Sequence, residues 1–367
     1  MTKQELEAYL SQIPSADRAA MDAAKKRQAQ LAKPPGSLGR LEELTIRLAG
    51  VTGQVHNHAD NCRIAVFAAD NGVVCEGVSS APQSVTLSQA VNMTHGITGM
   101  SAMAHCFGNS VCVVDVGIAA DGTPDGILPR KVRRGTENIR KAPAMTEAEA
   151  LRAISVGIEQ AERARADGVQ ALGMGEMGIG NTTTATAVLC ALTGASMQTA
   201  VGRGGGLTDA AFARKALVIT EALSLHRPDR NDVLDVLAKV GGLDIAAMTG
   251  AYLGCARNRI PAVVDGLISV VAALCAVRLC PQVRDVLFLS HASYERGYRI
   301  AAEELGAQPC LLLEMRLGEG SGCPIMFQVM KAACAAMNGM ATFSEAAIND
   351  GYLDEIRKTD AFTVRPI

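Results

Sequence analysis

The chain has 367 residues, of which 49% are hydrophobic and only 3% aromatic, and it contains 36 glycines. Its 35 basic and 37 acidic residues give a formal net charge of -2, so there is no global electrostatic field to attract nucleic acid or an anionic membrane. We therefore expect small molecules or other protein chains as partners.

The first segment of the chain is polar and has helix-forming patterns at residues 4–10, 15–32 and 38–49. It lacks the apolar core of a signal peptide, which predicts a cytoplasmic protein. Later apolar stretches such as residues 263–276 are shorter than the roughly 20 residues that span a bilayer. They are typical of a buried core, so no membrane association is predicted.

From Cys62 onward, short apolar runs alternate with glycine turns and helix-forming stretches. The runs are CRIAVFAADNG, SVCVVDVG, VQALGMGEMGIGN, PAVVDG and DVLFLSH. This alternation predicts an α/β fold in which helices cover both faces of a parallel sheet. Ligands of such folds lie at the carboxyl ends of the strands, which these runs place at Asp70, Asp115, Glu176, Asp265 and Ser290.

The C-terminal part contains the strand-to-loop segment EMRLGEGSGCP, a helix-like run at residues 325–340 and a polar tail. We expect helices from both chain ends to form a small helical domain beside the sheet. The predicted division is 1–58 for the N-terminal helices of that domain and 59–308 for the large α/β domain. Residues 309–367 then supply an active-site loop and the C-terminal helices.

The 11 cysteines are scattered, mostly in apolar runs, and no pair has CxxC spacing. This favours reduced, buried thiols over disulfides or metal ligands. His56 and His58 are not followed by ligands at metal-binding spacing. Neither a metal site nor a cofactor is predicted.

The first glycine-rich motif, GEMGIGNTTT at residues 175–184, ends a predicted strand and opens a helix. Backbone N–H groups and the helix dipole form an anion site there, and the glycines let a phosphate approach. An ordinary glycine turn capped by threonine explains the motif equally well. Because no Gly-Lys-Ser/Thr follows and GxGxxG is matched only loosely, a phosphomonoester is favoured over nucleoside triphosphates and dinucleotides.

Two further motifs have the same character. VGRGGGLTD at residues 201–209 precedes a helix that carries Lys215, whose ammonium group would complete a phosphate site as a point charge. RLGEGSG at residues 316–322 brings Glu319 close to a ligand between glycines. The alternatives are a solvated loop and a surface turn with a solvated glutamate. Glu176 and Glu319 together would supply a general base and a second acidic group.

These motifs occur together with several others in a fixed order. The others are KPPGSLGRLEEL, ADNGVVCEGVSSAPQSVT, GGLDIAAMTGA, VVDGLIS and SHASYERGY. The combination closely resembles the nicotinate-nucleotide:dimethylbenzimidazole phosphoribosyltransferases of cobalamin assembly, from about residue 33 to about residue 342.

The resemblance implies a Rossmann-like large domain and a homodimer, or a heterodimer with a paralogue. The implied reaction transfers the phosphoribosyl group of nicotinate mononucleotide to an aromatic base. It inverts the anomeric carbon and gives nicotinate and an α-ribazole-type phosphate. The pyridinium leaving group is already activated, so one base and good positioning suffice without a metal.

The resemblance also assigns roles by motif: Glu319 as the general base and Glu176 as a second carboxylate. The residues implied for the mononucleotide are Gly178, Gly180, Asn181, Thr182, Gly204, Lys215, Asp265, Ser293, Arg316 and Gly318. Those implied for the aromatic base are Ser79, Ser80, Gln89 and Leu317.

Three positions depart from the common pattern of the family. Asn71 and Tyr298 stand where histidine is common, and Ala81 stands where a large aromatic residue is common. Ala81 would reshape the base pocket, so the acceptor need not be dimethylbenzimidazole itself, and another benzimidazole, a purine and a phenolic base are the alternative hypotheses.

Three alternative functions remain open. The chain could be a partner-dependent paralogous subunit that binds without turnover, although it retains both Glu176 and Glu319. A nicotinamide-dependent dehydrogenase would need a glycine fingerprint after the first strand, which Ala69-Asp70-Asn71-Gly72 does not supply. A purely structural module explains none of the glycine-flanked acidic residues.

Overall fold

Six parallel strands form one sheet in the computed structural model, which describes residues 1–358. The strands are β1 Cys62–Ala69, β2 Ser110–Gly117, β3 Ile127–Pro129, β4 Ala171–Met177, β5 Ala262–Val264 and β6 Leu287–Leu289. Their order is β3-β2-β1-β4-β5-β6, so the chain reverses its direction across the sheet between β1 and β4. The predicted parallel α/β fold is confirmed, and this reversal leaves a crevice at the carboxyl ends of the strands.

The short edge strand β3 was not among the predicted strands. It has three residues and ends in Pro129, which donates no ladder hydrogen bond. It pairs with β2 alone, so it needs little of the apolar pattern that identifies a central strand. The five predicted strands are all present.

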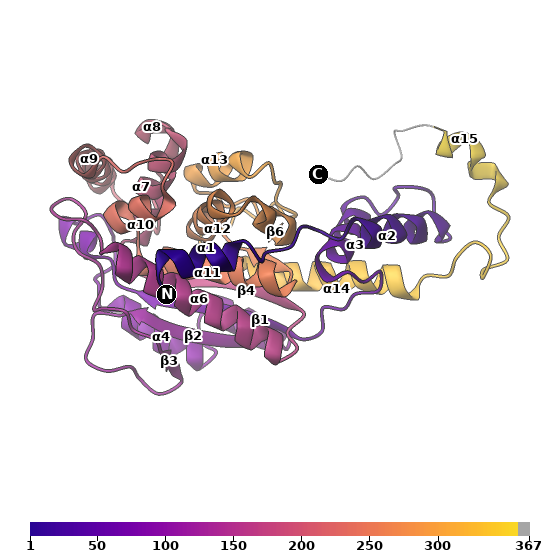
Figure 1. The fold of residues 1–367 in the computed structure, drawn as a ribbon, viewed down its shortest axis with the longest axis horizontal. Helices are drawn as coiled ribbons and strands as arrows, with labels where there is room; N and C mark the ends of the chain where they lie inside the picture. Colours follow the sequence, from indigo (N-terminus) through magenta and orange to yellow (C-terminus); the bar gives the residue numbers. More distant parts are fainter. Residues whose placement is uncertain (359–367) are drawn as a thin grey trace.

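Helices cover both faces of the sheet (Figure 1). They are α1 Lys3–Leu10, α2 Arg18–Gln30, α3 Arg40–Thr52, α4 Val85–Thr94, α5 Gly99–Cys106, α6 Glu147–Ala166, α7 Asn181–Thr193, α8 Met197–Ala200, α9 Asp209–His226, α10 Val233–Val240, α11 Leu243–Asn258, α12 Leu267–Leu279, α13 Arg296–Glu304, α14 Gly322–Gly339 and α15 Asp354–Arg357. Helices α4, α5 and α14 contact one face, whereas α11 and α12 contact the other and α6 packs on α11. Every residue of β4 is consequently buried.

Helices α6 and α11 cross with their backbones in contact. A Cβ atom on Gly157 of α6 would overlap the carbonyl oxygen of Ala247, and one on Gly250 of α11 would overlap that of Ile154. Glycine is therefore required where the two helices meet.

A second apolar cluster joins both ends of the chain. Ala24 of α2, Ile46 of α3 and Met337 of α14 are buried in it together with Leu31. Leu31 also forms an antiparallel bridge with Thr342. Figure 1 shows α2, α3 and the C-terminal end of α14 extending beyond the sheet.

Helix α1 packs against α11, although the predicted segment 1–58 assigns it to the small domain. Leu6 and Tyr9 lie in the main core, and the guanidinium group of Arg257 on α11 stacks 4.6 Å from the centre of the Tyr9 ring. The division at residues 58 and 308 stays a prediction. Residues 359–367 of its last segment lie outside the described residues.

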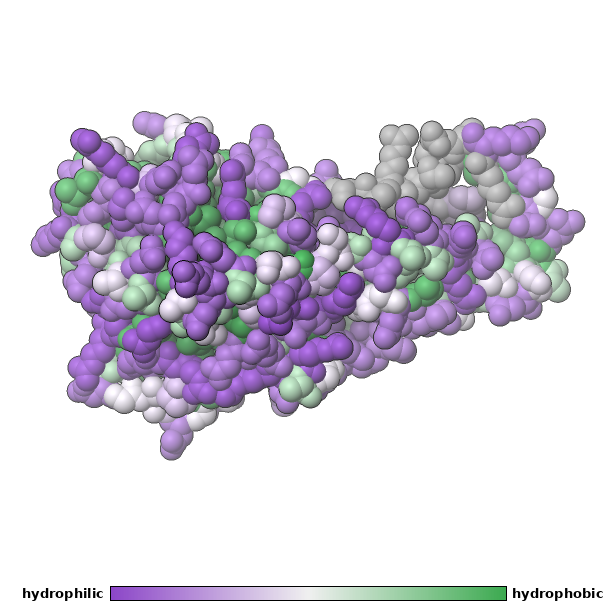
Figure 2. Space-filling view, viewed as in Figure 1, coloured by the Kyte–Doolittle hydropathy of each residue, from purple (hydrophilic) through white to green (hydrophobic). Residues whose placement is uncertain are grey.

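The face of the molecule seen in Figure 1 is mostly hydrophilic, with smaller apolar areas between the polar side chains (Figure 2). Within residues 1–358, no helix is both long and apolar enough to cross a bilayer.

We expect Gly157→Ala to lower the free energy of unfolding by about 2–3 kcal/mol, because the added methyl group forces α6 and α11 apart. The matched control is Gly339→Ala in α14, where a Cβ meets no atom within 4 Å. That change should be neutral or stabilise by up to about 1 kcal/mol. Urea unfolding measures both, and equal midpoints for the two variants would contradict the close helix contact.

Candidate active site

A pocket of about 240 Å³ opens at the carboxyl ends of β4 and β5. Its walls come from residues 78–89, 176–182, 203–207, 265–269, 291–295 and 316–319. All the predicted site residues except Lys215 line it, so the glycine-rich motifs converge as the sequence predicts.

Lys215 lies directly behind this wall, on α9. Its side chain is fully buried, and its Nζ donates hydrogen bonds to Thr182 Oγ1 at 2.8 Å and to the Gly202 carbonyl oxygen at 3.3 Å. Among the ion pairs of residues 1–358, none includes Lys215. Burial lowers the pKa of Lys215 to about 8. The charge of Glu295 opposes this shift but does not cancel it, so the buried ammonium group still favours an anion nearby.

The start of α7 adds to this anion-attracting region. Its N-cap residue is Gly180, which offers no side chain to cap the first turn. The positive end of the helix dipole therefore faces the pocket beside Thr182, whose hydroxyl already contacts Lys215. Gly178 and Gly204 border the same space.

Two carboxyl groups share one amide at the next part of the wall. Asn181 Nδ2 donates to Glu176 Oε2 and, at 3.1 Å, to Asp244 Oδ2. Burial, followed by the charge of Asp244, raises the pKa of Glu176 to about 8, and burial raises the pKa of Asp244 to about 6. Glu176 is thus held protonated near neutral pH, which suits a hydrogen-bond donor better than a base.

Glu319 is buried and has a left-handed backbone with φ of 65°. Its Oε1 accepts a hydrogen bond from Gln89 Nε2 at 3.3 Å, and its Oε2 accepts one from the Met100 N–H at 3.0 Å, in the first turn of α5. This backbone conformation is uncommon outside glycine and costs on the order of 1 kcal/mol. The surrounding structure therefore determines where this carboxylate lies.

The backbone of Glu319 rests on strand β4 at Gly175. A Cβ atom on Gly175 would overlap the carbonyl oxygen of Glu319. Gly175 therefore allows the 318–322 loop to approach the sheet, and Glu176 follows it on the same strand.

Asp265 follows strand β5 and is almost fully buried. Its Oδ2 accepts the Gly320 N–H at 3.1 Å, and its Oδ1 accepts the Gly322 N–H at 2.7 Å. Burial raises the pKa of Asp265 to about 7. Asp265 was predicted to contact the mononucleotide. In the structure, both of its carboxyl oxygens face the loop that carries Glu319.

The other side of the pocket is less polar. Ser79, Ser80, Gln89 and Leu317 lie there with aliphatic neighbours such as Val85. Ser79 Oγ accepts the Ala81 N–H at 3.2 Å, which holds the turn of that loop.

Ser293 and Arg316 complete the predicted set. Ser293 Oγ accepts the Glu295 N–H at 3.4 Å, and the Arg316 guanidinium stacks 5.6 Å from the centre of the Tyr294 ring. Both residues line the pocket, with Arg316 at its exposed margin.

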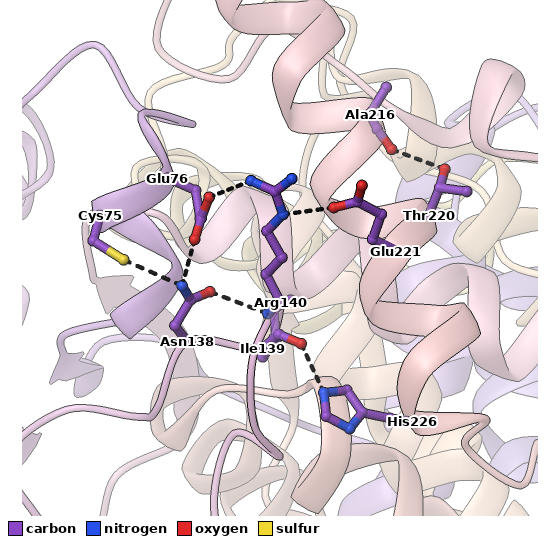
Figure 3. Close-up of polar contacts among 9 residues, drawn as sticks. All are labelled: Cys75, Glu76, Asn138, Ile139, Arg140, Ala216, Thr220, Glu221 and His226. Carbon is purple, nitrogen blue, oxygen red and sulfur yellow. Dashed lines mark hydrogen bonds and ion pairs between the residues drawn. The ribbon is translucent and has the colours of Figure 1, made fainter.

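A surface network ties the two sides of the pocket together (Figure 3). Arg140 donates to Glu76 Oε2 at 2.6 Å and to Glu221 Oε2 at 2.5 Å. Glu76 stands three residues before Ser79, and Glu221 lies on α9, which also carries Lys215. The network therefore links the loop of the less polar side to the helix of the anion-attracting side.

Comparison with known proteins assigns this chain to a family. A family model described as phosphoribosyltransferase matches residues 13–348. A nicotinate-nucleotide–dimethylbenzimidazole phosphoribosyltransferase of Clostridium perfringens (strain ATCC 13124) is 49% identical over 341 residues, which are 93% of this chain and 94% of that one. One of Acetivibrio thermocellus is 48% identical over 328 residues, which are 89% of this chain and 93% of that one.

The chain belongs to the nicotinate-nucleotide–dimethylbenzimidazole phosphoribosyltransferase family. A solved structure, CobT from Thermus thermophilus, is 40% identical and superimposes with a TM-score of 0.87, covering 91% of this chain and all of that one. The chain is thus a phosphoribosyltransferase, and the pocket described above is its candidate active site.

Two acidic residues at this site were not among the predicted site residues: Glu295, and Asp244, which lies behind the pocket wall and accepts a hydrogen bond from Asn181. Asp244 and Glu295 fall inside the GGLDIAAMTGA and SHASYERGY motifs, so the motifs offered a signal for both. Glu295 lines the pocket, and its Oε2 is buried without a hydrogen-bond partner. Within the described residues, no group of three or more His, Cys, Asp or Glu side chains could hold a metal ion.

We expect Glu176→Gln to flatten the pH dependence of stability. Because the folded pKa of Glu176 is about 8 and its ordinary value is 4.5, its contribution is complete below about pH 4.5 and is lost as the pH rises through 8. The Tm of the native enzyme should fall between about pH 5 and about pH 8, and that of the variant should fall less. Asp244 and Asp265 act in the same direction, so part of the slope remains.

Thermal unfolding at several pH values measures this slope, with Glu7→Gln on the exposed side of α1 as the matched control. The control should keep the native slope. A Glu176→Gln slope equal to that of the native enzyme would contradict the raised pKa.

Proposed function

We propose that this phosphoribosyltransferase transfers the phosphoribosyl group of nicotinate mononucleotide to an aromatic base used as a cobamide lower ligand. The products are nicotinate and an α-ribazole-type phosphate, with inversion at the anomeric carbon. The observation that carries the proposal is one pocket that has the buried Glu319 in its wall and the buried Lys215 directly behind Thr182 of the same wall. The names of the relatives, each a nicotinate-nucleotide–dimethylbenzimidazole phosphoribosyltransferase, support it.

The phosphate of the mononucleotide fits the side of the pocket that attracts anions. The start of α7, with Gly178, Gly180 and Thr182, and the Lys215 ammonium group all favour negative charge there. The residues that border the remaining space and would contact the ribose and phosphate are Asn181, Gly204, Ser293, Arg316 and Gly318.

The aromatic base fits the less polar side, between Ser79, Ser80, Gln89 and Leu317. There Glu319 would accept the ring proton while the base nitrogen attacks the anomeric carbon. The bond from that carbon to the nicotinate nitrogen breaks, and its electron pair neutralises the pyridinium ring. Protonated Glu176 would donate a hydrogen bond near the reacting groups without adding a second negative charge.

The identity of the base depends on the loop that contains Ala81. Its small side chain lines the pocket and leaves more room than an aromatic residue would. We propose dimethylbenzimidazole or a similar base as the acceptor. A phenolic base is the alternative acceptor for the same part of the pocket. We propose a homodimer, or a heterodimer with a paralogue in which this chain would need its partner for turnover.

We expect Glu319→Ala to lower kcat by roughly two to four orders of magnitude, the range for loss of a general base. Chromatography of reactions with nicotinate mononucleotide and a panel of bases measures nicotinate release and α-ribotide formation. Glu319→Gln separates the base from its structural role, because the amide still accepts the Met100 N–H. No product from the native chain with any base would contradict independent turnover and favour the partner-dependent subunit.

We expect Lys215→Met to raise the KM for nicotinate mononucleotide roughly tenfold to a hundredfold, since it removes the positive charge behind Thr182 and the hydrogen bond that orients the Thr182 hydroxyl toward the phosphate site. The KM for the base should change little. The control is Lys239→Met, which removes a lysine paired with Asp235 on α10, away from the pocket. An equal effect of both variants on the mononucleotide KM would exclude Lys215 as the phosphate partner.

A further inference from the structure

One buried carboxyl group holds the loop that presents Glu319. The N–H groups of Gly320 and Gly322 both donate to Asp265, at 3.1 and 2.7 Å, and the two glycines are one and three residues beyond Glu319. Asp265 is only 2% exposed, so water does not compete for these bonds. A displacement of Asp265 would therefore move the backbone that carries Glu319.

Asp265 is itself fixed to the sheet. Its own N–H donates to Ser269 Oγ at 3.0 Å, and Ser269 Oγ donates to the Met174 carbonyl oxygen at 3.3 Å. Met174 lies in the central strand β4, and Tyr252 contacts the same hydroxyl at 2.6 Å. The loop is thus connected to the most buried part of the fold through Asp265.

The conformation of Glu319 needs such an external restraint. Its left-handed backbone is unfavourable for a glutamate, and its carboxylate must still reach Gln89 and the Met100 N–H. The bonds from Gln89 and Met100 hold the end of the Glu319 side chain. The bonds to Asp265 hold the backbone at Gly320 and Gly322. Together they leave the carboxylate one position in the pocket.

Asp265 is poorly suited to contact the phosphate of a mononucleotide. Both oxygens of Asp265 already accept backbone hydrogen bonds from the 320–322 segment, and a carboxyl group offers a phosphate no cationic donor. We infer that Asp265 is a positioning residue that holds the Glu319 loop and does not bind the mononucleotide. This inference rests on the proposed function for the role of Glu319, but the restraint of the loop can be tested by itself.

The first experiment compares Asp265→Asn with the native enzyme. The asparagine side chain has one acceptor oxygen and one NH2 group. The NH2 group cannot accept a hydrogen bond from a glycine N–H, so the loop loses one of its two bonds. The kcat should fall roughly tenfold to a hundredfold, as expected when a catalytic group is misplaced by about 1 Å. The Kd for nicotinate mononucleotide, measured by calorimetry without a base, should stay within about threefold of the native value. A large loss of mononucleotide affinity would overturn the inference, because it would mean direct contact.

A double variant tests whether Asp265 acts through Glu319. The combination of Asp265→Asn with Glu319→Ala should have the same kcat as Glu319→Ala alone, because the group that Asp265 positions is gone. Independent, multiplying effects of the two substitutions would overturn the inference.

Limited proteolysis provides a readout that needs no turnover. Arg316 is exposed and precedes the restrained loop, so trypsin should cleave after Arg316 at least about fivefold faster in Asp265→Asn than in the native enzyme. Equal rates would overturn the inference. If the native enzyme makes no product, the proposed function fails, and this cleavage rate still decides the role of Asp265.

Asp115→Asn is the matched control. Asp115 is also a buried aspartate near a strand end, on β2, but its oxygens accept hydrogen bonds from the Ile118 N–H and from Thr123 Oγ1. That variant should lose stability and keep the native kcat and cleavage rate. If Asp265→Asn does not fold, Ser269→Ala weakens the anchoring of Asp265 more gently and should give smaller changes in the same direction, and unchanged values would overturn the inference.

Discussion

The pocket depends on the close approach of residues 318–322 to the central strand β4. Gly175 leaves room for the Glu319 backbone, and Asp265 supplies the acceptors for the N–H groups that follow it. Because buried N–H groups without partners are costly, the loop can lie against the sheet only where a buried acceptor exists. The uncommon backbone of Glu319 is one consequence, and the fixed position of its carboxylate is another.

The distribution of buried charge follows from the same arrangement. Lys215 lies behind Thr182, whereas Glu176 and Asp244 share the amide of the neighbouring Asn181. Burial disfavours ionisation of these groups, lowering the pKa of Lys215 and raising those of Glu176 and Asp265. Under the proposed reaction, the phosphate of the substrate would compensate Lys215, and a cationic anomeric centre would lie nearer the carboxyl groups.

Much of the site could be predicted from the sequence because carboxyl ends of parallel strands meet at one edge. The runs that end at Glu176 and Asp265 indicated two strand ends at that edge, and the glycines after Glu176 marked backbone close to a ligand. The partners of Asp265 could not be predicted, since Gly320 and Gly322 contribute only backbone N–H groups. The position of α1 could not be predicted either, because an apolar helix face can pack against either domain. The contact of Tyr9 with Arg257, which decides the position, involves residues far apart in the sequence.

The two sides of the pocket also differ in how firmly they are built. The carboxyl groups and Lys215 are buried in the main body of the fold, whereas Leu317 is 56% exposed and lies opposite the loop of Ser79 and Ala81. That loop is tied to α9 by the ion pairs of Arg140, and partly exposed pairs of this kind contribute only about 1 kcal/mol or less. Substitutions on that side should therefore change the shape of the acceptor site at little cost in stability. Under the proposed function, such substitutions would change which acceptor base fits and leave the side for the phosphoribosyl donor unchanged.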